Sequence, residues 1–509
     1  SGAGFYQTLA YTRTGMPAKQ NAGDHQAGPH ERNKSLEREW LYDKAYNLTA
    51  IADSLRGSMF NTITANDQIS HATWTGDSSQ FPLCEELFTY DKNLNITRRQ
   101  TRVNDVLESE THQQQQHGRV ISSEHKGWRH STHRINPDTG KGEDGKFVRV
   151  VNANNITWKY DVNGRLVQKL VDKGGYRPLE WRYRWDARSQ LTGLETPEGE
   201  RWEYKYDPFG RRISKRCTNR DKPGMDFHWN GDQLTEEIPV GADGTPEDEN
   251  AIRWIYEPGS FTPFARYEKG QLHYAVTDTV GRVQELLTEN GLIVWKGKQQ
   301  LWGREEGINK EGAPTCRLRF PGQYEDTESG LYYNRFRYYD CETGQYISSD
   351  PIGLAGGVNP YGYVRSPLVY VDLLGLSPDI TFNKTHQDSL PKPKGTGTNG
   401  GRLQSHHGLQ QEWSKNNLPG YDPKLAPTVT IETGKGLPHT TISNAQNARR
   451  DARVAQGKCK WSSSLQDELM NIVNDFRNTG FDDATINKIL DQQYKMLDKL
   501  QIDYTRIIL

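Results

Sequence analysis

The sequence predicts a mainly β fold of stacked β-hairpins over most of the chain, followed by a small α+β domain that ends in helices. Two observations carry this prediction. A short motif of aromatic residues and a polar turn recurs between residues 38 and 237. After Leu376 the composition changes to Lys, Asn, Gln and His with long helical patterns, so the 509 residues divide into a repetitive part and a non-repetitive part.

The repeated motif has the pattern of a β-hairpin. Each copy has two aromatic residues, separated by one other residue, before a polar turn. An aliphatic residue follows about five positions after the Asp. From Asp161 onward the copies are 21–25 residues apart, a spacing typical of stacked repeats. We therefore expect a YD-repeat β core over residues 1–320. The copies are REWLYDKAYNLTAI (38–51), ELFTYDKNLNITR (86–98), TWKYDVNGRLVQK (157–169), RYRWDARSQLTGL (182–194), WEYKYDPFGRRIS (202–214) and FHWNGDQLTEE (227–237).

The composition fits a wide sheet packed by aromatic rings. Only 33% of the residues are hydrophobic, but the chain has 25 Tyr, 13 Trp and 14 Phe. Such rings pack along strands while their polar edges stay hydrated. The five cysteines are odd in number and widely separated without a CxxC pair, so we expect reduced thiols rather than a zinc or redox centre. We expect no membrane span, because no apolar run reaches 18 residues, and no signal peptide in the opening SGAGFYQ.

The two parts differ in charge. Residues 1–377 hold 47 Lys and Arg against 51 Asp and Glu, whereas residues 378–509 hold 17 against 14. The excess of positive charge in the second part favours a polyanionic partner, although an ordinary solvated surface has the same balance.

The run PGQYEDTESGLYYNRFRYYDCETGQYISSDPIGLAGGVNPYGYVRSPLVYVDLLGL (321–376) separates the two parts. It resembles the end of the core in Rhs (YD-repeat) polymorphic toxins, and residues 256–295 resemble the late Rhs core. The resemblance implies the C-terminal part of a β ribbon wound into a cocoon around its own C-terminal domain. It also implies a toxin that acts in competition between bacteria and has a cognate immunity protein. Delivery without a signal peptide would run from the producer's cytoplasm into the target cell's cytoplasm, through the spike or adaptor proteins of a contact-dependent system of type VI.

Two aspartates in this border region, Asp350 in SSDPIGL and Asp372 in YVDLLGL, match the self-cleavage motifs of that family. The resemblance implies an aspartyl-protease-like cut between Leu376 and Ser377. Two carboxyls that share a proton can activate water and protonate a carbonyl oxygen. Leu373 departs from the family pattern, which usually has Pro there. The plainer interpretation is that both aspartates only cap β-turns.

Residues 377–401 are rich in Pro, Gly, Thr and Lys and are predicted to form an extended linker. Residues 402–509 follow as the toxin domain. Its start, RLQSHHGLQQEWSKNNLPGYDPK, resembles the HNH/endonuclease VII superfamily toxins with an SHH signature, which is matched by Ser405, His406 and His407. The resemblance implies a metal-dependent nuclease with a ββα-metal fold. DNA is the expected substrate because this superfamily mostly cuts it, and RNA remains open.

Adjacent histidines on a strand point to opposite sides, so one can bind a divalent ion such as Mg²⁺ or Zn²⁺ while the other takes a proton from water. We assign His406 as metal ligand and His407 as general base, although the two roles are exchangeable. His439, at a predicted helix start, is the candidate second ligand. Residues on that helix have candidate roles too: Asn444 or Asn447 in orienting the base, and Arg449, Arg450 and Arg453 in binding phosphates.

Two other functions stay open at this point. The C-terminal domain can belong to a different enzyme class, such as a deaminase or an ADP-ribosyl transferase, but the sequence lacks the HxE and PCxxC pair of a zinc deaminase. Alternatively, the chain is a YD-repeat adhesion or scaffolding protein whose C-terminal part is only a helical cap. The amphipathic segments after residue 462 predict helices that pack on the domain and carry no chemistry.

Overall fold

The structure is a computed structural model of the whole chain. It describes residues 4–12, 16–24, 33–43, 47–64, 68–76, 83–91, 95–119, 146–258, 260–306, 314–351, 359–364, 366–376, 381–383, 385–387, 402–434, 438–479, 481 and 483–507.

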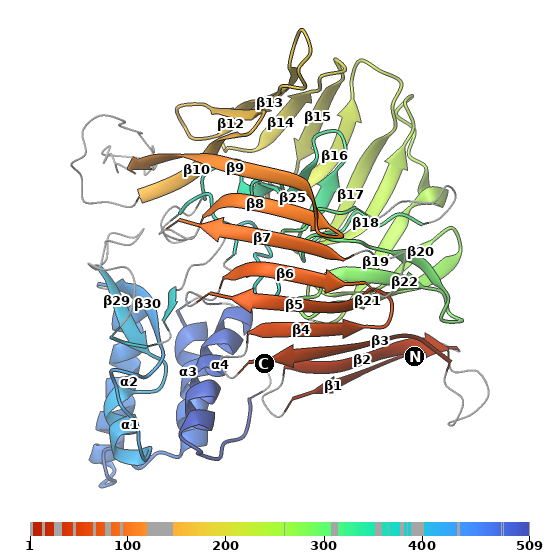
Figure 1. The fold of residues 1–509 in the computed structure, drawn as a ribbon. Helices are drawn as coiled ribbons and strands as arrows, with labels where there is room; N and C mark the ends of the chain where they lie inside the picture. The colour runs from red at the N-terminus through yellow and green to blue at the C-terminus, as the bar shows by residue number, and fades with distance from the viewer. Residues whose placement is uncertain are drawn as a thin grey trace.

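A single antiparallel sheet of 23 strands forms the first part of the chain, and each strand pairs with the next one along the sequence. Figure 1 shows the red and orange strands stacked in order and the yellow and green strands curving round beside them. The predicted mainly β shell of stacked hairpins is thereby confirmed, whereas the expected winding around the C-terminal domain is not seen, because that unit lies beside the sheet. The strands are β1 Phe5–Tyr11, β2 Pro17–Asp24, β3 Asn33–Tyr42, β4 Leu48–Asp53, β5 Gly57–Ile63, β6 Ile69–Thr75, β7 Cys84–Tyr90, β8 Ile96–Val103, β9 Val106–Arg119, β10 Lys146–Ala153, β11 Ile156–Tyr160, β12 Leu166–Val171, β13 Leu179–Trp185, β14 Leu191–Glu195, β15 Arg201–Tyr206, β16 Arg212–Cys217, β17 Gly224–Asn230, β18 Gln233–Val240, β19 Ile252–Tyr256, β20 Pro263–Glu268, β21 Gln271–Thr277, β22 Val283–Leu287 and β23 Ile293–Lys296, with a 3₁₀ turn at Asp248–Asn250.

All six predicted hairpins form, and the five copies that have the motif Asp share one turn chemistry. The pairing register shifts at the aromatic residue before the turn in every copy. In the copy at Asp207, for example, the carboxylate accepts the backbone N–H of Arg211, four residues later, at 2.9 Å. The aspartates at 43, 91, 161 and 186 accept the corresponding N–H at 2.8–2.9 Å. The motif Asp is therefore a turn cap that replaces a backbone acceptor.

In five of the six hairpins the motif aromatic donates a hydrogen bond to the backbone of an earlier strand. Tyr206 donates its hydroxyl to the backbone carbonyl of Leu191 at 2.7 Å. Trp185 likewise donates its indole N–H to the carbonyl of Leu166 at 2.6 Å. These bonds explain why the repeats tolerate Tyr or Trp at this position, since both have a long ring with a donor at its far end.

Buried ion pairs hold the beginning of the sheet against its end. Arg38 of β3 contacts Asp53 and Glu285 of β22, each at 2.9 Å, and all three side chains are almost fully buried. Gln20 also donates to the carbonyl of Thr277 at 3.2 Å. The meander therefore curls until β2 and β3 meet β21 and β22 through side chains.

A small sheet from the border region fills the interior of this curved sheet. Its strands are β24 Tyr324–Asp326, β25 Leu331–Asn334, β26 Arg337–Asp340 and β27 Gln345–Tyr346. Their tyrosines are buried in three clusters together with aromatic residues of the long sheet. Asp326 forms ion pairs with two cations of β16, Arg212 and Lys215, of which Lys215 lies at 3.1 Å. The border region is thus part of the core of the carrier.

The C-terminal unit has a hydrophobic core of its own, built from residues 409–497. Figure 1 shows its helices, in blue, beside the ends of β4–β6. The capping box at Ser464 and Asp467 begins α3, and the buried apolar faces of α3 and α4 confirm the predicted amphipathic helices. The elements are β28 Thr381–Asn383, β29 Arg402–His407, α1 Gln411–Asn417, β30 Thr428–Thr433, α2 Pro438–Ala455, α3 Leu465–Arg477 and α4 Asp483–Lys499.

Residues 377–401 differ in part from the extended linker that their composition predicts. Thr381–Asn383 forms β28, which pairs with β30 in the three-stranded sheet β28–β30–β29 of the C-terminal unit. The central strand β30 pairs with β29 on one edge and with β28 on the other, so β28 provides backbone partners for an edge that would otherwise be unpaired. Elsewhere, all five cysteines are free, as predicted. No helix within the described residues has the length and apolar character needed to cross a bilayer.

Candidate functional site

His406 and His407 lie on opposite faces of β29, as the alternation of a strand requires. The ring of His406 contacts the ring of His439 at the start of α2 and the ring of Phe476 in α3. The ring of His407 instead contacts His386. β29 pairs with β30, with α1 between them in sequence, and α2 follows β30, which gives the ββα order that the sequence predicts. The structure therefore brings His406 and His439 together and places His407 on the other face of β29.

His406 and His439 are arranged as two ligands of one ion would be. Their ring centroids are 4.9 Å apart at an angle of 84°. His406 is 5% exposed, and its Nε2 has no hydrogen-bond partner. Burial, followed by the neighbouring His439 and His407, lowers the pKa of His406 to about 3, so its ring is neutral at pH 7. A buried, neutral and unpaired imidazole nitrogen fits a metal ligand. Among the described residues no group of three or more His, Cys, Asp or Glu forms a complete metal site, so His406 and His439 would supply two protein ligands.

His407 is held by a backbone carbonyl. Its Nε2 lies 3.0 Å from the carbonyl oxygen of Pro423. A carbonyl oxygen can only accept, so Nε2 carries the proton and Nδ1 of the neutral ring has the lone pair. Burial lowers the pKa of His407, and the neighbouring His386 and Lys415 lower it further. The ring is therefore neutral at pH 7 and can take a proton at Nδ1.

One histidine of the site, His386, was not predicted. Its ring centroid is 4.7 Å from that of His407, and its Nδ1 lies 2.8 Å from the hydroxyl of Ser405. His386 lies three residues after β28, within the range assigned to the linker. A lone histidine among Lys, Thr and Gln gives no periodic signal, and only the pairing of β28 with β30 brings it to the sheet.

The three predicted phosphate-binding arginines have partners within the unit. Arg449 contacts both carboxylate oxygens of Asp475 in α3, with Nη1–Oδ1 at 2.7 Å. Arg453 donates to the carbonyl of Lys460 at 3.0 Å and contacts Glu468 at 3.5 Å. Both side chains therefore join α2 to α3, and their contact with phosphate stays a prediction.

Within the part of the chain that the structure describes, Arg450 pairs with its own helix, through Asp451 at 2.7 Å and Asn447 at 3.0 Å. Asn447 and Asn444 are both exposed on α2. Of the three arginines, Arg450 is the one whose partners Asp451 and Asn447 lie at the surface, where a phosphate can replace them. The orienting role of Asn444 or Asn447 stays a prediction.

The two border aspartates meet at one guanidinium. Arg337 Nη2 lies 2.8 Å from Asp350 Oδ2 and 3.3 Å from Asp372 Oδ2, and the three side chains are at most 2% exposed. Tyr346 donates its hydroxyl to Asp372 Oδ2 at 2.8 Å, and its ring lies under the guanidinium, 3.7 Å from the centroid to Arg337 Cζ. Asp372 Oδ1 also accepts the N–H of Leu374 at 3.3 Å and that of Leu376 at 3.0 Å, which is the capping pattern of the YD aspartates. Both the capping interpretation and the cleavage role therefore stay predictions.

The same centre holds the backbone that leads to the predicted cut. Asp372 Oδ1 accepts the N–H of Leu376 at 3.0 Å, and Arg337 Nε donates to the carbonyl of Gly375. Gly375 has φ 65°, and a Cβ there would lie 2.4 Å from the carbonyl oxygen of Asn334, so only glycine fits. Ser377, on the far side of the predicted cut, lies outside the described residues.

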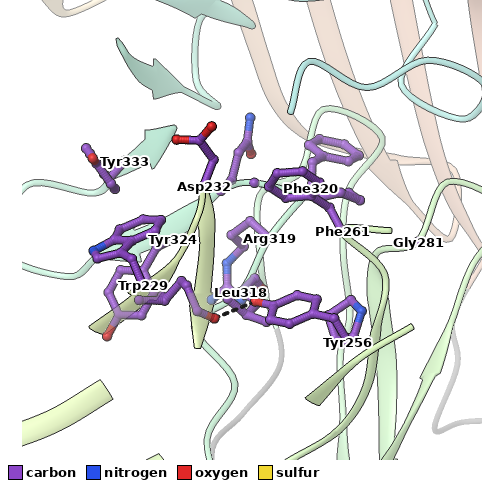
Figure 2. Close-up of a pocket in the computed structure, with 15 residues that line it drawn as sticks. Trp229, Asp232, Tyr256, Phe261, Gly281, Leu318, Arg319, Phe320, Tyr324 and Tyr333 are labelled. Atoms are coloured by element: carbon purple, nitrogen blue, oxygen red, sulfur yellow. Dashed lines mark hydrogen bonds between the residues drawn. The ribbon is translucent and has the colours of Figure 1, made fainter. Parts of the chain in front are cut away.

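A cavity elsewhere in the carrier has no comparable chemistry. Figure 2 shows it lined by Trp229, Tyr256, Tyr324 and other aromatic side chains. Its volume is about 20 Å³, room for a single water molecule. The two side-chain polar atoms of Gln323, which lines it, have no protein partner and suit such a water. This cavity is too small for a substrate.

Comparison with known proteins agrees with this division of the chain. Residues 83–354, more than half of the chain, match the family described as Teneurin YD-shell. The chain belongs to the YD-shell family. Residues 400–498 of this YD-shell protein match the HNH/Endo VII superfamily toxins with a SHH signature. Both predicted resemblances, to the YD-repeat core of Rhs toxins and to the SHH toxins, are thereby confirmed.

Similar proteins of known name are much longer than this YD-shell chain. Probable deoxyribonuclease RhsA of Dickeya dadantii (strain 3937) is 40% identical over 244 residues, which are 47% of this chain and 17% of that protein. Double-stranded DNA deaminase toxin A of Burkholderia cenocepacia (strain H111) is 30% identical over 276 residues, 48% of this chain and 18% of that protein. The solved TcdB2-TccC3 structure covers 73% of this chain and 19% of its own, with 18% identity and a TM-score of 0.43. The chain thus spans less than a fifth of these relatives.

Proposed function

We propose that the chain carries a metal-dependent nuclease in residues 402–509, with DNA as the favoured substrate. This proposal rests on the different surroundings of the two adjacent histidines of β29. The unpaired Nε2 of His406 faces His439, whereas His407 lies on the other face with Nε2 bonded to the Pro423 carbonyl. The relatives named as deoxyribonucleases, RhsA and RhsB of Dickeya dadantii, at 40% and 41% identity, support DNA over RNA.

The residues divide the reaction between them. His406 and His439 hold the divalent ion, which supplies positive charge for the scissile phosphate and the leaving oxygen when it is bound. His407 accepts a proton from the attacking water at Nδ1, because Nε2 already donates to a carbonyl. Arg450 is placed to contact a neighbouring phosphate once it leaves Asp451.

The test uses the full chain with plasmid DNA, in Mg²⁺, Mn²⁺ or Zn²⁺ and in EDTA. We expect metal-dependent cleavage that falls by about 10²–10⁴-fold in His407→Ala, the usual contribution of a general base. The matched control is His112→Ala, an exposed histidine of β9 in the carrier. If DNA stays intact with every metal but RNA is cleaved, the proposed activity becomes that of an RNase. If neither DNA nor RNA is cleaved, the nuclease proposal is rejected.

We further propose that the carrier releases the nuclease by cutting its own chain between Leu376 and Ser377. Support comes from Asp350 and Asp372, which share Arg337 in the core, and from the bond between Asp372 and the N–H of Leu376. One carboxyl would activate water and the other would protonate the carbonyl oxygen at the cut.

Self-cleavage is tested by mass spectrometry of the purified chain. We expect two products in the wild-type chain and one uncut species in Asp350→Asn and in Asp372→Asn. Asp207→Asn is the control, because Asp207 caps a YD turn and has no contact with the border centre in the structure. Cleavage that persists in both border variants would assign the aspartates to turn capping alone.

The biological role follows as a proposal from the relatives' names. Double-stranded DNA deaminase toxin A and Toxin protein Tse5 of Pseudomonas aeruginosa, which is 32% identical over 259 residues, are named as toxins. We propose an antibacterial effector, delivered through spike or adaptor proteins of a type VI system and blocked by a cognate immunity protein. Competition between a producer and a sensitive strain tests this role: His407→Ala in the producer should abolish killing while delivery of the protein continues.

A further inference from the structure

We propose that His386 is a positioning residue of the nuclease, supplied by the segment between the border and the SHH strand. This inference rests on the proposed nuclease function. His386 lies 10 residues after Leu376 and outside residues 400–498, which match the toxin family. The functional unit would therefore begin upstream of its signature, yet still downstream of the predicted cut.

A chain of hydrogen bonds fixes the His386 ring. The hydroxyl of Ser405 donates its one hydrogen to Thr428 Oγ1 at 2.8 Å, so its oxygen accepts from His386 Nδ1, also at 2.8 Å. Ser405 and Thr428 are at most 5% exposed. Ser405, the first residue of the SHH signature, therefore holds the His386 imidazole on the His407 face of the sheet.

His386 and a backbone carbonyl together restrain the His407 ring. The two imidazole centroids are 4.7 Å apart, and His407 Nε2 lies 3.0 Å from the Pro423 carbonyl. The segment of His386 is attached to the same loop, because the N–H of Gln387 donates to the carbonyl of Lys424 at 3.0 Å. The contact of the His407 ring with His386 and the hydrogen bond at its Nε2 together fix the direction in which Nδ1 of His407 points.

The contact is with the proposed base and not with the proposed metal ligands. His406 and His439 meet on the opposite face of β29. Loss of a residue that orients a site typically costs 10–100-fold in activity. His386→Ala should therefore lower kcat on DNA by 10–100-fold and leave KM and the affinity for Zn²⁺ unchanged.

The experiment compares variants of the full chain. His386→Ala removes both the ring and the hydrogen bond, whereas His386→Asn keeps a donor near the position of Nδ1 and should recover part of kcat. Ser405→Ala should lower kcat to a similar extent, and the double variant should add little, because both residues act through one bond. Gln387→Ala is the matched control: its side chain is exposed, and its backbone bond to Lys424 remains. Zn²⁺ affinity is measured by calorimetry and folding by circular dichroism.

Each result has one meaning. A fall in kcat with unchanged Zn²⁺ affinity and fold, partial recovery in His386→Asn and a non-additive double variant support the positioning role. Wild-type kcat in His386→Ala overturns this inference and leaves the nuclease intact. Equal losses in Gln387→Ala, or a lost fold, show that the segment is only structural. A wild-type chain that cuts no nucleic acid overturns both proposals.

Discussion

Replacement of Arg337 by Met tests the electrostatics of the border centre. The guanidinium contacts Asp350 and Asp372 at 2.8 and 3.3 Å, with all three side chains at most 2% exposed. Without it, two buried carboxylates face each other uncompensated, and breaking a buried pair in this way costs about 3–5 kcal/mol.

The assay is urea-induced unfolding of the carrier, followed by the near-UV circular dichroism of its buried tyrosines. We expect Arg337→Met to lose about 3–5 kcal/mol of unfolding free energy at pH 7, because two buried carboxylates lose their shared cation. Self-cleavage should stop. The triple variant with Asp350→Asn and Asp372→Asn should regain most of the stability and still not cleave. Undiminished stability of Arg337→Met, or no recovery in the triple variant, would refute the reasoning.

Three other outcomes are expected. Asp207→Ala should destabilise the carrier by about 0.5–2 kcal/mol in urea unfolding, because the N–H of Arg211 loses its acceptor, whereas the same change in a disordered turn would have no effect. Burial alone would raise the pKa of Asp326, but its two buried cations outweigh burial and hold that pKa below 3.8, so this carboxylate stabilises the fold above pH 3.8. Acid titration should show this stability falling as the pH drops below 3.8, and Asp326→Asn should flatten that part of the curve. Gly375→Ala should abolish self-cleavage in the mass spectrum, because its Cβ would lie 2.4 Å from the Asn334 carbonyl; normal cleavage would mean that this backbone is not held during the reaction.

The sequence predicted the carrier well because its signal is repeated and local. Most hairpins combine an Asp that caps the turn with an aromatic donor that reaches an earlier strand, as at Asp207 and Tyr206, and both residues are visible in the motif. Arg212 shows where such reasoning stops. It occupies the position that other copies fill with an aliphatic residue, such as Leu191, and it is buried against Asp326, 114 residues away in sequence. A local pattern cannot identify so distant a partner.

The C-terminal site was predicted in its local part only. The adjacent histidines separate by face as strand geometry requires, and His439 reaches His406 because the ββα unit is short. His386 was missed since its place depends on an added strand. Arg449 reads as a phosphate contact from its helix alone, but α3 brings Asp475 against it. Charge on a helix face therefore does not show whether another element of the fold already neutralises it.

The position of the proposed cut suits a release that disturbs neither part. Arg337, Asp350 and Asp372 belong to the core of the carrier, and the core of the C-terminal unit contains only residues from 409 onward. The cut at Leu376 precedes β28 and His386, so the third strand and the proposed positioning residue stay with the released unit. A cut at the start of the SHH strand would instead remove both. If His386 has the proposed role, the proposed nuclease would need the segment that looks like a linker, and a cut that leaves this unit whole would have to lie before Thr381.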